Sequence, residues 1–265
     1  PKIIEGDVEY PAIMERTGRV DPTARLYRAV IGRQMTGSLA GQIKSDNLFD
    51  LSVKYTSQFS GYIYRNCLIN TWKFAAAQSD LVNITTTIWG RNREVAGSLD
   101  LIQPSDAFFP KNTRIVTWND VVINITGDAD TNLTGEYVRT FEATINNNLE
   151  RYYTFNGKLE PQDIAARKRD IDGSMVLLGR HPGLSAHAET NQERCFEESN
   201  IQFGYQLTHT DCNSTFLATL PNIIFRIEEI ALANDIFETT VQWHCIPDEI
   251  ELDSADLLDV GGVVE

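Results

Sequence analysis

Apolar and polar residues alternate along several segments of the chain with a period of two, which is typical of β-strands that bury one face. In residues 140–146, the apolar side chains of Phe141, Ala143 and Ile145 are each followed by a polar residue. Three further segments repeat this pattern, with predicted inward positions at Val82, Ile84, Thr86 and Ile88, at Ile223, Phe225 and Ile227, and at Phe237, Thr239, Val241 and Trp243. Residues 113–126 are predicted to form a hairpin.

Helical periodicity is weaker, and the predicted helices are short. Residues 23–31 follow Asp21 and Pro22, and residues 162–168 follow Pro161. Proline suits the first position of a helix, because the N–H that it lacks would have no partner within the helix. Two more short helices are predicted over residues 46–55 and residues 191–198. The expected fold class is therefore mainly β with a few short helices.

Short motifs recur in the same order in the two halves of the chain. Three of them repeat at offsets of 135, 139 and 136 residues, with residues 14–16, 20–22 and 33–39 matching residues 149–151, 159–161 and 169–175. A fourth pair around Trp89 and Trp243 is weaker, because aligning the tryptophans puts the two apolar faces out of phase. We therefore predict a tandem duplication, with repeats near residues 8–106 and 117–246. Residues 1–106 would hold an arm and the first repeat, and residues 107–246 a hairpin linker and the second.

The charge balance narrows the range of partners. The chain has 23 Lys and Arg against 37 Asp and Glu, which gives a net charge of −14. Wrapping a nucleic acid or binding an anionic membrane needs clustered cations, so neither is expected. Seven of the acids lie in residues 247–265, which contain no Lys or Arg. This acidic tail is expected to be solvated or to order on a partner. The chain has no apolar run long enough for a membrane span and no secretory signal, so production and retention in the cytosol are expected.

Motifs for catalysis are missing from the sequence. The histidines have no HExxH spacing, and neither a nucleophile elbow nor a phosphate-binding glycine loop is present, so we expect no enzyme and no cofactor. His181, His187 and Glu189 could ligate a metal, but they lie in a loop where solvated side chains are the ordinary case, and no metal site is predicted. The cysteines are too widely spaced for zinc or redox motifs, and only a Cys195–Cys212 disulfide stays open as a sharper alternative to free thiols.

Alternating strands leave exposed edges, which a protein must cover, charge or pair. Pairing of edges between subunits can close a sheet into a ring-shaped barrel. Self-assembly is therefore the function that the strand pattern favours.

Several segments, in order, resemble the tail tube proteins of tailed bacteriophages, also called major tail proteins. Residues 141–151 with 168–174 are similar to the central motif of this family, and residues 220–225 with 235–243 to its closing hairpin. Residues 66–70 through 88–90 are similar to its first hairpin. The resemblance covers most of residues 60–246. It identifies as structural motif residues Asn147, Asn148, Leu149, Glu150, Gly173, Ser174, Pro221 and Trp243.

The resemblance implies two roughly orthogonal β-sheets flanked by a helix, in subunits that form rings and stack into a hollow virion tube. Inner strands of all subunits would form one barrel around a channel for genome delivery. The implied partners are copies of the chain, a tape measure protein, a tail terminator, and baseplate or distal tail proteins, with DNA as transient cargo and no membrane. Assembly would take place in the host cytoplasm. A duplicated chain favours trimeric rings, whereas a single fold per chain would give hexameric rings.

Two other functions remain as alternatives from the sequence. A tail-end or baseplate ring protein can share the tube fold, and it would form one ring without stacking. A β-sandwich carbohydrate-binding module would instead bind sugars through Trp72, Trp118 or the pair Tyr152 and Tyr153.

Overall fold

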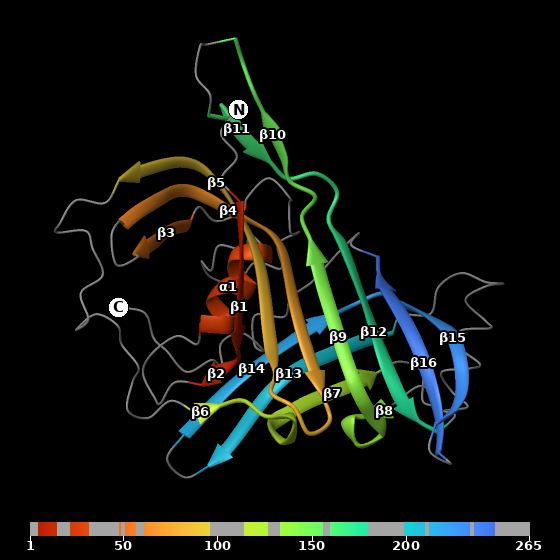
Figure 1. The fold of residues 1–265 in the computed structure, drawn as a ribbon. Helices are drawn as coiled ribbons and strands as arrows, with labels where there is room; N and C mark the ends of the chain where they lie inside the picture. Colours follow the sequence, from red (N-terminus) through yellow and green to blue (C-terminus); the bar gives the residue numbers. More distant parts are fainter. Residues whose placement is uncertain are drawn as a thin grey trace, which may run out of the picture.

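The computed structural model describes residues 5–14, 22–31, 48, 51–56, 61–95, 114–126, 133–155, 160–179, 199–209, 212–233 and 236–246. Strands dominate these residues, which confirms the prediction of a mainly β chain (Figure 1). Their helical elements are one α-helix, α1 (Pro22–Ile31), and two short 3-10 helices, η1 (Trp118–Asp120) and η2 (Gly135–Tyr137). No helix in these ranges is long and apolar enough to cross a membrane.

The larger of two main sheets has eight antiparallel strands. Seven follow the order β1-β5-β4-β9-β12-β16-β15, and β3 pairs with the first part of the long strand β4. Their bounds are β1 (Glu5–Pro11), β3 (Leu51–Thr56), β4 (Gly61–Ala77), β5 (Asn83–Val95), β9 (Val138–Asn146), β12 (Asp170–Leu178), β15 (Ile223–Ala233) and β16 (Ile236–Cys245). Strands β1 and β15 therefore lie at the two ends of this order.

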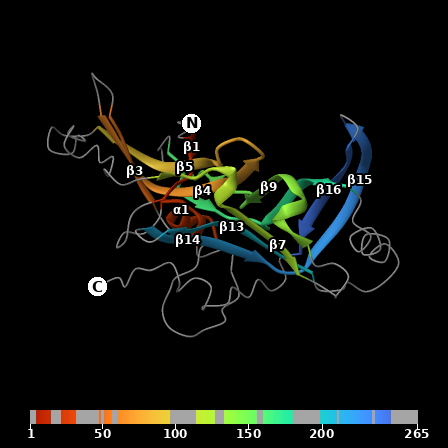
Figure 2. The same ribbon diagram turned by 90° about the horizontal axis from the view of Figure 1, so that it is seen from below.

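A four-stranded sheet forms the second layer, in the order β14-β13-β7-β8. Its strands are β7 (Val121–Thr126), β8 (Leu133–Thr134), β13 (Asn200–His209) and β14 (Cys212–Leu220). These strands run across those of the larger sheet, and α1 lies between the two layers (Figures 1 and 2). Two small ladders complete the described fold: β2 (Ile13–Met14) pairs with β6 (Arg114–Ile115), and β10 (Glu150–Tyr152) with β11 (Asp163–Ala165).

Aromatic side chains connect the helix to both sheets in the core. Tyr27 of α1 contacts Trp72 of β4 and Phe216 of β14, with ring centroids 5.1 and 5.4 Å apart. Phe141 of β9 and Phe203 of β13 lie 5.3 Å apart across the layers. All five side chains are almost fully buried. Edge-to-face and offset contacts of this kind add to the stabilisation that burial of apolar area provides.

The period-two alternation correctly identified most of the inward positions. Buried positions from that prediction are Phe141, Ala143, Ile145, Val82, Ile84, Thr86, Ile223, Phe225, Thr239, Val241 and Trp243, with Ile88 packed against their edge. Among the described side chains Phe237 is the exception, because it is 60% exposed, and the side chain of Ile227 lies outside the described residues. Phe237 lies near the start of β16, where the neighbouring strand β12 ends at Leu178 and offers no further core residue to cover it.

Two of the predicted helices are wrong. Leu51–Thr56, which overlap the helix predicted over residues 46–55, form strand β3, and Asp163–Ala165 form strand β11. In both cases a neighbouring strand supplies the backbone partners, β4 for β3 and β10 for β11. Such pairing overrides the weak helical preference of a short segment. The helix predicted over residues 23–31 is confirmed as α1, and residues 191–198 lie outside the described residues.

The hairpin predicted within residues 113–126 is also wrong. Strand β6 pairs with β2, whereas β7 pairs with β13 and β8. Between them, the carboxylate of Asp120 accepts hydrogen bonds from the backbone N–H and the hydroxyl of Thr117, both at 3.0 Å. This local capping forms the 3-10 helix η1, which directs the two strands to different sheets.

Strands from both predicted repeats share the larger sheet and its core. One cluster of buried residues includes Trp72 from the first half and Trp243 from the second. The matched prolines differ in their surroundings, because Pro22 begins α1 whereas Pro161 precedes strand β11. The duplication and the boundary between residues 106 and 107 stay predictions, and the acidic tail lies outside the described residues.

Candidate functional site

The bend between β9 and β10 is built around Asn147, which is fully buried. Its amide nitrogen Nδ2 donates hydrogen bonds to the carbonyls of Val30 and Ile69, both at 2.9 Å. Its Oδ1 accepts a hydrogen bond from Nε of Arg169 at 2.7 Å. One side chain therefore ties the end of α1, the middle of β4 and the approach to β12 together.

Arg169 completes this buried polar cluster. Its Nη2 donates to the carbonyls of Val30 and Ile31, at 3.2 and 3.0 Å. Carbonyls in the last turn of a helix lack partners within the helix, and a cation is favourable at this end of the helix dipole. Burial lowers the pKa of Arg169 to about 10, while the nearby Tyr27 raises it, so the side chain stays charged at neutral pH. Asn147 and Arg169 together form what we call the helix-end cluster.

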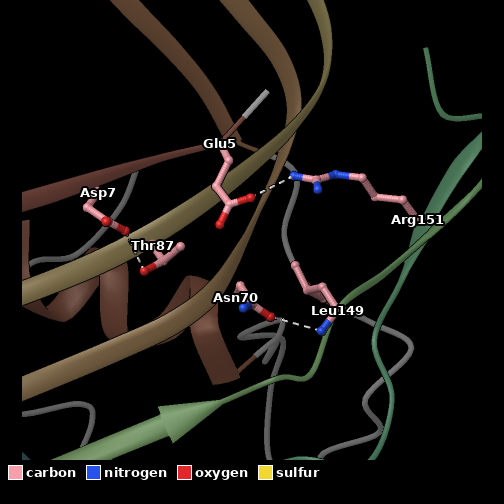
Figure 3. A network of polar contacts seen from close by, with 6 residues as sticks. All are labelled: Glu5, Asp7, Asn70, Thr87, Leu149 and Arg151. Carbon is pink, nitrogen blue, oxygen red and sulfur yellow. Dashed lines mark hydrogen bonds and ion pairs between the residues drawn. The ribbon is translucent and has the colours of Figure 1, made fainter. Parts of the chain in front are cut away.

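The next two residues complete the bend. Asn148 has a backbone φ of 48°, in the left-handed region that asparagine tolerates better than most residues. Its Nδ2 donates to the carboxylate of Asp170 at 2.6 Å. The backbone N–H of Leu149 donates to Oδ1 of Asn70 at 2.9 Å, as Figure 3 shows, and its side chain packs with Ile164 in a small second cluster. The bend is thus fixed by contacts to β4, to β11 and to the start of β12.

Beyond the bend, β10 and β11 form a projecting hairpin that we call the arm (residues 150–155 and 160–165; Figure 1). At its root, the carboxylate of Glu150 accepts hydrogen bonds from the guanidinium of Arg167 and from the hydroxyl of Tyr152, the latter at 2.9 Å. The hydrogen bond from Arg167, assisted by that from Tyr152, lowers the pKa of Glu150 below its ordinary value. This carboxylate therefore links β10 to the segment that follows β11 at neutral pH.

Arg151 attaches the root of the arm to the edge of the large sheet. Its guanidinium carbon lies 3.9 Å from the ring centroid of Trp89, a cation–π contact. One of its nitrogens lies 3.4 Å from the carboxylate of Glu5 on β1 (Figure 3). On the same strand, Asp7 accepts a hydrogen bond from the hydroxyl of Thr87 at 2.7 Å. The position of the arm is thus coupled to β1 and β5.

Gly173 lies opposite Trp243 in the middle of the larger sheet. A Cβ atom at this glycine would lie 2.0 Å from Cζ2 of Trp243 and 2.2 Å from the carbonyl oxygen of Glu142. The indole is held in place by stacking on Phe141, with centroids 5.9 Å apart and an angle of 17° between the planes. Close approach of an aromatic ring to the backbone is a reason for glycine within a strand.

Pro221 lies at a third position, in the turn between β14 and β15. Its carbonyl accepts a hydrogen bond from Sγ of Cys245 at 3.0 Å. Burial, together with the charge of Asp172, raises the pKa of this thiol to about 12, so Cys245 stays protonated and weakly reactive at neutral pH. Cys67 is also a buried thiol outside any disulfide, while Cys195 lies outside the described residues.

The larger sheet presents its second face away from α1, and we call it the polar face. Strand registers align its residues in rows, of which one runs Thr85, Lys73, Thr144, Asp172 and His244. The face consists of Thr71, Lys73, Ala75, Thr85, Thr87, Thr140, Glu142, Thr144, Asp172, Ser174, Val176, Thr240, Gln242 and His244, all partly or fully exposed. It is therefore a surface mainly of hydroxyl, amide and charged groups.

An ion pair and a contact between a histidine and a carboxylate lie on this face. Nζ of Lys73 is 2.7 Å from a carboxylate oxygen of Glu142, and the imidazole of His244 contacts the carboxylate of Asp172. Paired charges present little unbalanced potential to a charged molecule that passes over them. The geometry thus provides a broad polar surface rather than a pocket that could bind one ligand.

A comparison with family profiles matches residues 16–211 to the family described as phage tail tube protein, which is more than half of the chain. The chain belongs to the phage tail tube protein family. A comparison with curated proteins gave no match. The tail tube family consists of structural proteins, which places this chain among the components of the virion tail.

The motif residues of this tail tube protein occupy three separate positions. Residues 147–150 lie together at the bend, Gly173 and Trp243 are neighbours in the sheet with Ser174 beside them on the polar face, and Pro221 lies in a turn. The family match includes the first two groups except Trp243, which lies beyond residue 211 together with Pro221. Their described contacts are with other parts of the same subunit and shape its fold.

The residues considered for sugar binding do not form one platform. Trp72 is fully buried in the core. Trp118 is 42% exposed and lies in η1, whereas Tyr152 and Tyr153 are exposed on the arm. Sequence reasoning also missed Arg169, although it lies within the motif at residues 168–174. The only sign of its role in the sequence was an arginine within a segment that otherwise resembles a strand. Its hydrogen-bond acceptor at the end of α1 is 138 residues away, so the local sequence could not reveal the contact.

Proposed function

We propose that this tail tube protein is the repeating subunit of the tube itself, which assembles with copies of itself into stacked rings around a channel for genome delivery. The observation that carries the proposal is the polar face, a broad surface of hydroxyls with an ion pair between Lys73 and Glu142, on a sheet whose opposite face holds the core. Membership of the family supports the structural role.

The edges of the larger sheet supply a route to ring formation. An edge strand has a row of N–H and C=O groups that can pair with another chain. Strand β1 has Glu5, Asp7 and Glu9 on one side, and β15 at the other end of the order presents the exposed Arg226. Joining β1 of one subunit to β15 of the next would continue the sheet, and closure would remove both edges.

In such a ring the polar face would line the channel. DNA is retained by surfaces whose free cations displace its counterions. Lys73 has a carboxylate at 2.7 Å, so it offers phosphates less net charge than an unpaired lysine would. Hydroxyls such as those of Thr85 and Thr144 keep the surface hydrated without adding charge. This chemistry suits a channel through which DNA passes without binding.

The number of chains in each ring is part of the proposal. The sequence echo favours a trimer with two folds per chain, whereas a single fold per chain would give a hexamer. We propose the trimer, with the hexamer as the alternative. A tape measure protein inside the channel, with tail terminator and baseplate or distal tail proteins at its ends, completes the proposed set of partners, and assembly would take place in the host cytoplasm.

Electron microscopy of the purified, concentrated chain tests the proposal. Negative-stain images should show tubes with a central channel, and a cryo-EM reconstruction would count the chains in each ring. Rings that never stack would support the tail-end ring alternative. A chain that stays monomeric at all concentrations, as measured by sedimentation velocity, would contradict self-assembly.

A further inference from the structure

The arm exposes aromatic side chains at one end of the subunit. Tyr152 and Tyr153 are 46% and 45% exposed, and the side chain of Phe155 is completely exposed. The root of the arm is held by Glu150 and Arg151, so these aromatic residues project from a fixed base. Exposed aromatic residues that cluster on one element mark interaction surfaces more often than solitary ones do.

A pocket of about 280 Å³ lies at the other end of the subunit, where β4, β9 and β12 meet η1 and β7. Apolar residues such as Trp118 and Leu178 line it together with the polar side chains of Gln78, Asn119, Arg139 and Thr140. Trp118 and Leu178 are 42% and 36% exposed. The pocket is therefore open to a side chain from another molecule. Figure 1 shows the arm and the turn between β4 and β5, which leads into the pocket, at opposite ends of the subunit.

We infer that the arm of one subunit inserts Phe155 into this pocket of a second copy in the adjacent ring, an inference that rests on the proposed stacking of rings. A subunit cannot fill its own pocket, because β9 alone separates the two sites by nine residues, or about 30 Å. A contact between two different surfaces of identical copies closes into a ring when the rotation between the copies returns to the start, and it builds an open stack when it does not. The arm and the pocket lie at opposite ends of the subunit, so a contact between them extends a stack.

The dimensions of the two sites fit this occupant. A cavity of about 150 Å³ already accommodates benzene, so the pocket of about 280 Å³ has room for the phenyl ring of Phe155 beside its apolar residues. The three exposed aromatic side chains of the arm would bury roughly 600 Å² in total even if covered completely. That is less than the area of about 800 Å² that each partner buries in a stable complex. One contact is too small to hold a soluble partner, whereas several contacts around a ring act together by avidity.

Substitutions in each site give the first test. Phe155→Ser and Leu178→Glu should leave ring formation and the melting temperature unchanged, and both should reduce the mean tube length at least tenfold in negative-stain images. Val95→Ser is the matched control, because Val95 is 78% exposed and belongs to neither site. The inference would be overturned if the Phe155→Ser variant formed tubes as long and as resistant to salt as those of the wild type.

Mixing preformed rings of the two variants tests the direction of the contact. Phe155→Ser rings keep a working pocket and Leu178→Glu rings keep a working arm, so only one pairing is possible. The mixture should contain pairs of rings and no longer stacks, as measured by sedimentation velocity. Long tubes from the mixture, or no pairs at all, would overturn the inference. Absence of rings from the wild-type chain would instead contradict the proposed function, and with it the contact.

Discussion

The two faces of the larger sheet are made by the same strands and differ in almost every property. The inward face contains aromatic side chains in mutual contact, such as Trp72 and Phe74, with less than 1% of their surface exposed. The outward face has hydroxyls and ion pairs, such as that between Lys73 and Glu142. Neighbouring residues of one strand therefore contribute alternately to the core and to the polar face. Substitutions on the inward face should change folding, and those on the outward face should change what the assembled tube binds.

The largest effect is expected for Gly173→Val. The new side chain would overlap the ring of Trp243 and the carbonyl oxygen of Glu142, and backbone atoms cannot rotate away. We expect a loss of about 3 kcal/mol or more in the free energy of unfolding, at the upper end of overpacking effects. The melting temperature should fall by roughly 6–12 °C. It should be measured below the concentration at which the chain assembles, because assembly itself stabilises the fold.

Ser174→Val is the matched control for this substitution. Ser174 is the next residue of β12, it lies on the polar face, and a β-branched side chain suits an exposed strand position. Its melting temperature should stay within roughly 2 °C of the wild-type value, as expected for a surface substitution. If Gly173→Val and Ser174→Val lowered the melting temperature equally, the two faces of the sheet would not differ in how tightly they are packed.

A smaller but clear loss is expected for Asn147→Ala. The substitution removes hydrogen bonds to the carbonyls of Val30 and Ile69 and to the guanidinium of Arg169. It leaves buried polar groups without these partners, so the free energy of unfolding should fall by about 2 kcal/mol. The melting temperature should therefore fall by roughly 4–8 °C.

Asn148→Gly is the control in the same bend. Glycine adopts the positive φ of this position without strain. The hydrogen bonds lost to Asp170 and to the carbonyl of Lys168 are partly buried and exposed, respectively, so a shift smaller than half of that for Asn147→Ala is expected. If the glycine variant were the less stable of the two, the conformation of the bend rather than the helix-end cluster would determine stability.

Alternation along single strands was predictable, because it depends only on which side of a strand is buried. Phe141 and Val241 were assigned correctly from the sequence on this basis. The partner of a strand was not predictable, because pairing joins segments that are distant in the sequence. Residues 51–56 became a strand because β4 lies beside them, and β6 joined β2 instead of β7.

The helix-end cluster was beyond sequence reasoning for the same physical reason. Asn147 was singled out by resemblance, but its role depends on carbonyls of Val30 and Ile69, which lie 117 and 78 residues away. Arg169 stays buried because the end of α1 supplies acceptors for its charge. A pattern of polar residues in one segment carries no information about such distant partners.

The smallest effect on stability and the most specific effect on function are expected for Glu142→Gln. The side chains of Lys73 and Glu142 are 38% and 41% exposed, and a pair so accessible to water contributes less than about 1 kcal/mol to stability. Losing the carboxylate nevertheless leaves Lys73 free to contact phosphates on the polar face. We expect assembled tubes of this variant to retain short double-stranded DNA in cosedimentation at low salt. Each phosphate contacted should add about 0.9 to the slope of log affinity against log salt concentration.

The double variant Lys73→Gln with Glu142→Gln isolates the cause of this retention. It removes the cation that Glu142→Gln sets free, so its tubes should retain no more DNA than wild-type tubes. Thr140→Gln, which adds an amide elsewhere on the polar face, controls for the change of shape. If Glu142→Gln tubes retained no more DNA than those of the double variant, Lys73 would not face the channel. Because Lys73 shares a row with Thr144 and Asp172, the whole polar face would then have to lie elsewhere in the tube.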